Sequence, residues 1–145
     1  MSTSLKEKAE RIQNILEQLA EESKSGKPVI VEGRKDEQAL KSRGVTGKMV
    51  CAKKGLKTII DVISEIEDKC PKEVILMLDF DREGRELTEK LKNHMEKAGI
   101  KANIHYWIKL SSLTGREVKD VEGLATYMKT LKTRLEIHKG NIYQR

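Results

Sequence analysis

The order of apolar and polar residues along the chain predicts an α/β protein. Three short apolar runs, at residues 29–31, 48–52 and 74–79, have the length and boundaries of strands buried in a sheet, and 103–108 is predicted as a fourth strand. Elsewhere apolar residues recur at intervals of three and four, which is typical of amphipathic helices. These predicted helices span about 4–23, 36–43, 55–66, 85–98 and 121–135.

Strands that alternate with helices indicate a parallel sheet whose two faces are covered. We therefore expect a Rossmann-like α/β fold, with a parallel sheet of about four strands and helices on both faces. The 145 residues fit one domain. We divide it into an N-terminal amphipathic helix within 1–26, a core at 27–110, and a C-terminal loop and helix at 111–145 that pack on the same domain.

Acidic residues stand at the ends of two predicted strands. Glu32 follows the run at 29–31, Asp79 ends the run at 74–79, and Asp81 comes two residues later. Asp36 comes one helical turn after Glu32. Because neighbouring parallel strands end at the same edge of a sheet, these carboxylates are expected to meet. Without a counterion they would repel one another and some of their pKa values would rise. Ligands that are all oxygen favour a hard cation, so we expect Mg²⁺, with Mn²⁺ as the alternative.

Two sequence strings in this region resemble the Toprim domain. They are V-I-V-E-G-R-K-D at residues 29–36 and D-F-D-R-E-G at 79–84, and the resemblance covers residues 27 to about 110. This domain is shared by type IA and type II topoisomerases, bacterial primases, recombination proteins of the RecR type and small ribosomal-RNA maturation nucleases. The chain therefore looks like a small stand-alone Toprim protein.

The resemblance implies a role for each acid. Glu32 matches a general acid/base, and Asp79 and Asp81 match the residues that hold Mg²⁺, with Asp36 assisting. The predicted metal ligands are thus Asp79, Asp81, Glu32 and Asp36. Arg85 stands where type IA topoisomerases usually have another acid, so the details of those enzymes do not transfer.

Basic residues and glycines flank the acids and are predicted to bind the substrate. Lysine and arginine side chains hold phosphates, and a glycine lets a phosphate backbone approach the chain closely. The candidates are Gly33, Arg34, Lys35, Lys53, Lys54, Arg82, Gly84 and Arg85. The net charge of +6 agrees with a polyanionic partner, whereas 3% aromatic residues offer no platform for base stacking. We expect contacts mainly to the backbone of RNA or DNA.

Two classes of function stay open. The chain has no room for the separate domain that carries a topoisomerase's nucleophilic tyrosine, nor for the extra modules of a primase. The first class is a Mg²⁺-dependent nuclease or phosphotransferase; the second is a non-catalytic metal- and nucleic-acid-binding module, or a subunit of a larger complex. A protein partner or a homodimer is compatible with either. The absence of a signal peptide or membrane-length apolar run favours a cytoplasmic protein, with Cys51 and Cys70 as reduced thiols.

Overall fold

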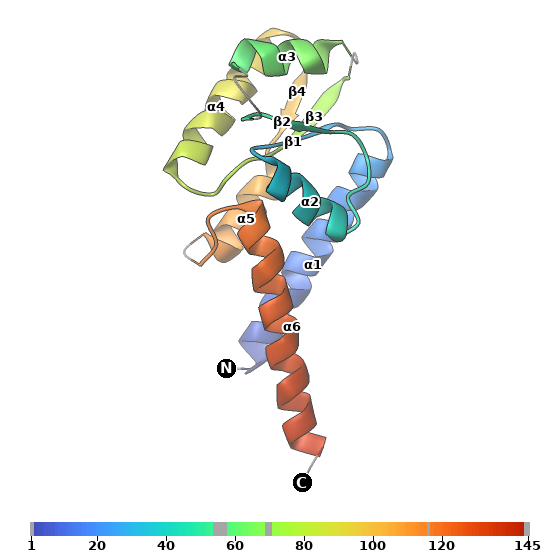
Figure 1. Cartoon of the computed structure of the whole chain (residues 1–145), viewed down its shortest axis with the longest axis vertical. Coiled ribbons are helices and arrows are strands. Elements are labelled where there is room, and N and C mark those ends of the chain that lie inside the picture. The colour runs from blue at the N-terminus through green and yellow to red at the C-terminus, as the bar shows by residue number, and fades with distance from the viewer. Residues whose placement is uncertain (1, 54–57, 69–70, 116, 144–145) are drawn as a thin grey trace.

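The structure, a computed structural model, describes residues 2–53, 58–68, 71–115 and 117–143. Strands and helices alternate along most of the chain, and two helices follow the last strand (Figure 1). In chain order the elements are α1 (Ser2–Lys24), β1 (Val29–Val31), α2 (Arg34–Ser42), β2 (Met49–Cys51), α3 (Ile59–Glu67), β3 (Glu73–Met77), α4 (Arg82–Lys97), β4 (Lys101–Asn103), α5 (His105–Thr114) and α6 (Val121–Tyr143).

The four strands form one parallel sheet in the order β2-β1-β3-β4. The two central strands are β1 and β3, and their register pairs Val31 with Met77. The residues that follow them, Glu32 and Asp79, therefore emerge side by side at the carboxyl edge of the sheet. The predicted α/β class and the four-stranded parallel sheet are confirmed.

Helices cover both faces of the sheet, as predicted. Alternate residues of each strand point to opposite faces, so each face has its own apolar side chains to bury. On one face, Val31 and Met77 pack with apolar residues of α1, α2, α5 and α6. On the other, Ile30 and Leu76 pack with residues of α3 and α4. The α1 and α6 helices extend together away from the sheet (Figure 1). No helix in the described part of the chain is both long and apolar enough to cross a membrane.

The prediction of a strand at 103–108 was wrong. The fourth strand ends at Asn103, and His105 already begins α5, which continues to Thr114 through residues that were predicted as a polar loop. The Asn103 side chain accepts a hydrogen bond from the His105 N–H at 2.9 Å, which helps to turn the chain into the helix. The aromatic and β-branched residues near position 106 suit a strand, but burial against the sheet at helical spacing outweighs this preference.

Helices α2, α3 and α4 begin at different residues from those predicted, and α2 starts at Arg34 where 36 was expected. Helix α4 starts at Arg82 and not at 85, so Gly84 lies in its first turn. Asp81 is the N-cap of this helix and accepts a hydrogen bond from the Gly84 N–H at 2.8 Å. Helix α3 begins at Ile59; its predicted start at Gly55 lies outside the described residues.

Candidate metal centre

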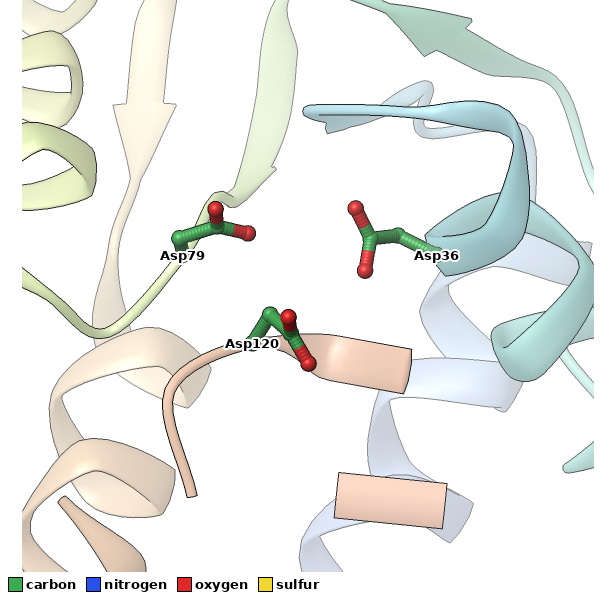
Figure 2. Close-up of side chains that lie close together, drawn as sticks. All are labelled: Asp36, Asp79 and Asp120. Atoms are coloured by element: carbon green, nitrogen blue, oxygen red, sulfur yellow. The ribbon is translucent and has the colours of Figure 1, made fainter. Parts of the chain in front are cut away.

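Three aspartates from separate segments converge at the carboxyl edge of the sheet. Asp79 follows β3, Asp36 lies in the first turn of α2, and Asp120 directly precedes α6. One carboxylate oxygen from each lies within 4.8 Å of the other two. Figure 2 shows the three carboxyl groups facing a common space. The sequence predicted Asp36 and Asp79 as members of such a site but missed Asp120.

Asp36 is a buried carboxylate held by two backbone N–H groups. One oxygen accepts a hydrogen bond from Gly33 at 3.1 Å, and the other accepts one from Glu122, in the first turn of α6, at 3.0 Å. The side chain therefore links the start of α2 to the start of α6. Burial raises the pKa of Asp36, and the negative charges of Asp120 and Glu32 raise it further, while the two N–H donors oppose the rise.

Glu32 is buried beside the cluster and lies against Asp79. Its Oε1 accepts a hydrogen bond from the Asp79 N–H at 3.2 Å, and its Oε2 forms an ion pair with Lys53 Nζ at 3.1 Å. Burial, a hydrogen bond to the Glu32 side chain and the charge of that carboxylate raise the pKa of Asp79 to about 8. The hydrogen bond to Glu32 likewise raises the pKa of Lys53. The sequence predicted such a gathering of carboxylates and a rise in some of their pKa values.

The Asp120 carboxylate both caps helix α6 and faces the other two aspartates. Its Oδ1 accepts a hydrogen bond from the Gly123 N–H at 2.6 Å, which caps α6. Its carboxylate also reaches the space shared with Asp36 and Asp79. The α6 helix packs on α2, and this packing brings Asp120 to the sheet edge.

The backbone that presents Asp79 is also held by the Trp107 side chain. The indole N–H of this α5 residue lies 3.0 Å from the carbonyl oxygen of Leu78 and 3.2 Å from that of Asp79. The next residue, Phe80, is buried and lies beside the Trp107 ring at a centroid distance of 6.3 Å. The α5 helix therefore supports the strand end that carries the candidate metal ligand.

The remaining predicted site residues stand at the starts of α2 and α4 or lie outside the described part of the chain. Asp81 is exposed as the α4 cap, and its role as a metal ligand stays a prediction. Arg34 and Lys35 are exposed at the start of α2, Arg85 is exposed on α4, and Arg82 pairs with Glu86 at 3.3 Å. Gly33 and Gly84 support the first turns of α2 and α4. Lys54 lies outside the described residues.

The donor set fits a hard divalent cation. Every ligand atom that Asp36, Asp79 and Asp120 offer is a carboxylate oxygen, which Mg²⁺, Mn²⁺ and Ca²⁺ prefer to nitrogen or sulfur. Burial and the neighbouring carboxylates raise the pKa of Asp79, as expected where acidic side chains gather without a cation. The acidic triad is consistent with a divalent metal site.

Comparison with known proteins identifies the family. The family model described as "Toprim domain" matches residues 3–109, so the chain belongs to the Toprim family. Within it, the chain belongs to the group named UPF0292. The UPF0292 protein of Methanosarcina acetivorans is 36% identical over 89% of this chain and 88% of the relative. That of Methanocaldococcus jannaschii is 35% identical over 82% of this chain and 91% of the relative.

A solved structure supports the fold independently. A protein from Aquifex aeolicus superposes with a TM-score of 0.63 at 22% sequence identity, covering 75% of this chain and 94% of that one. At this identity the similarity concerns the fold alone. The resemblance inferred from the two acidic strings is thus confirmed as membership of the Toprim family.

Proposed function

We propose that this protein is a Mg²⁺-dependent enzyme that hydrolyses or transfers phosphodiester bonds in RNA or DNA. The observation that carries the proposal is the convergence of Asp36, Asp79 and Asp120 beside the buried Glu32. Carboxylates gathered this closely suit a divalent cation, and the Toprim motifs favour a nucleic acid as the partner. The net charge of +6 supports a polyanionic substrate.

Each group of residues has its own task in this proposal. Asp36, Asp79 and Asp120 would hold the ion, which when bound stabilises negative charge on the reacting phosphate. Glu32 would move a proton to or from an attacking or leaving oxygen, because its carboxylate lies next to the cluster. The exposed side chains of Arg34 and Lys35 would contact neighbouring phosphates.

The test is cleavage of labelled single-stranded and duplex RNA and DNA, with Mg²⁺, with Mn²⁺ and with a chelator. We expect cleavage only with a divalent ion, and a loss of roughly 100-fold or more in Asp79→Asn and in Glu32→Gln. Asp68→Asn is a matched control, since Asp68 is exposed at the end of α3. Cleavage that persists in both site variants would overturn the proposal.

The same assays separate the second class of function. Metal-dependent, salt-sensitive binding without turnover on any substrate would identify a nucleic-acid-binding module or a subunit of a larger complex. Co-purification from the native cell would then reveal a protein partner. Turnover by the purified chain with Mg²⁺ excludes this second class.

A further inference from the structure

Lys53 places a positive charge between two acidic groups at the edge of the metal centre. Its backbone N–H donates to the Glu32 carbonyl oxygen at 2.9 Å, which continues the pairing of β1 and β2 past the ends of both strands. Its ammonium nitrogen lies 3.1 Å from Glu32 Oε2 and 3.8 Å from an oxygen of Glu83, in the first turn of α4. Carboxylates from two elements thus converge on one ammonium group.

This arrangement engages both oxygens of Glu32. Oε2 faces Lys53, and Oε1 accepts the hydrogen bond from the Asp79 N–H. The side chain of Glu32 is only 6% exposed, so its charge requires a partner close by. Among the described residues, the candidate metal cluster consists of Asp36, Asp79 and Asp120 and does not include Glu32. Glu32 is therefore adjacent to the cluster but oriented toward an ammonium and a backbone N–H.

We propose that this site takes a single divalent ion, and that Lys53 is a positioning residue that supplies the second positive charge. Phosphoryl-transfer sites that use two metal ions hold them about 3.5–4 Å apart. Here the ammonium of Lys53 replaces the second ion and keeps Glu32 out of the ligand set, available for proton transfer. The inference rests on the metal site of the proposed function, but it requires no catalytic activity for its test.

Removal of the Lys53 charge should create a second metal site. In Lys53→Met the aliphatic length is nearly kept, while Glu32 and Glu83 lose the cation between them. We expect Glu32, with the neighbouring acids, to recruit a second divalent ion in this variant. The Lys53 side chain is 51% exposed and lies outside the core, so Lys53→Met disturbs packing little, although Glu32 loses its ion pair.

The experiment counts bound Mn²⁺ per chain by isothermal titration calorimetry and by electron paramagnetic resonance of the free ion. We expect one ion in the wild type and in Lys53→Arg, and two in Lys53→Met. The double variant Lys53→Met/Glu32→Gln should return to one, because the new ligand is lost. Lys48→Met, at the opposite end of β2, is the control and should bind one ion. Circular dichroism melting checks that every variant is folded.

Each other outcome has a distinct meaning. Two ions in the wild type, or a single ion in Lys53→Met, would overturn the role of Lys53 and leave the metal site standing. A second ion that persists in the double variant would overturn the link between Lys53 and Glu32. A wild-type protein that binds no Mn²⁺ would overturn both this inference and the metal-dependent function.

Discussion

Gly84 lies so close to the backbone of Asp79 that no side chain fits between them. A Cβ atom at position 84 would come within 3.0 Å of the carbonyl oxygen, the carbonyl carbon and the Cα of Asp79. Gly84 is in the first turn of α4, and the side chain of Asp81 binds its N–H. The glycine thus lets the start of α4 pack directly on the strand end that presents the candidate metal ligand.

Gly84→Ala is expected to displace this strand end. Because the clash is with backbone atoms, α4 or Asp79 must move, which we expect to lower the free energy of unfolding by about 1–3 kcal/mol. Binding of Mn²⁺ should weaken in parallel. Urea denaturation and calorimetry measure the two effects.

Gly33→Ala is the matched control for this prediction. A Cβ atom at Gly33 would have Asp36 Oδ2 as its nearest neighbour at 3.7 Å, an ordinary contact. We expect this variant to lose less than about 1 kcal/mol, the usual scale of a change at a helix cap. If Gly84→Ala matched the wild type in both stability and Mn²⁺ affinity, the close approach would have no importance for the site.

Asp120→Asn separates the capping role of this residue from its role toward a metal. Asparagine caps helices about as well as aspartate, so the variant should keep the stability of the metal-free protein. Mg²⁺ at about 100 times its dissociation constant should stabilise the wild type by about 2.7 kcal/mol. We expect Asp120→Asn to lose most of this gain in melts with and without Mg²⁺, and Asp68→Asn to keep it. Equal stabilisation of both variants by Mg²⁺ would remove Asp120 from the ligand set.

The raised pKa of Asp79 predicts how stability depends on pH in the absence of metal. In the unfolded chain an aspartate titrates near pH 3.9, whereas the pKa of Asp79 in the folded protein is about 8. Between these values the folded protein holds a proton that the unfolded chain has released. The contribution of Asp79 to the free energy of unfolding therefore falls as pH rises through this window.

Asp79→Asn isolates this contribution, because the amide does not titrate. Compared with the variant, the wild type should lose stability between about pH 4 and pH 8 in urea denaturation with a chelator present. With metal the sign reverses: binding displaces the proton, so the apparent affinity for Mg²⁺ should increase up to about pH 8. A difference between wild type and Asp79→Asn that does not change with pH would contradict the raised pKa.

The core of the fold could be predicted because its strands are buried on both faces. Runs such as Val29–Val31 are apolar throughout, and the residues after them are the ones that the sheet brings together. The region from 103 to 108 misled the prediction because it joins the end of β4 to the start of α5. The buried residues Tyr106, Leu110 and Thr114 have helical spacing, which becomes visible only when the window extends past the predicted strand.

Only those residues of the candidate site that come shortly after a predicted strand could be found from the sequence. Glu32, Asp36 and Asp79 follow from two neighbouring strands. Asp120 lies 41 residues after Asp79, and the residues around it predict only a helix cap. Its place in the cluster depends on the packing of α6 against α2, a long-range contact that no local pattern reveals. The ion pair between Lys53 and Glu32 was unpredicted too, although both residues had been selected as candidates.

The salt dependence of nucleic-acid binding tests the basic residues that flank the site. Arg34 is the first residue of α2, and its exposed side chain has no ion-pair partner within the described ranges. If it contacts a phosphate, Arg34→Ala should weaken binding to RNA and DNA of different sequences alike. It should also reduce the slope of log K against log salt by about 0.7–0.9.

Fluorescence anisotropy with Ca²⁺ in place of Mg²⁺ allows this slope to be measured under conditions chosen to suppress turnover. Lys48→Ala is the control, because Lys48 is exposed at the far end of β2 and should leave the slope unchanged. A loss of affinity for only one of the tested RNA or DNA sequences would assign Arg34 to base recognition. An unchanged slope would place the nucleic acid elsewhere on the protein. The predicted result, a uniform loss together with a shallower slope, requires that the phosphate backbone pass over the start of α2, next to Asp36.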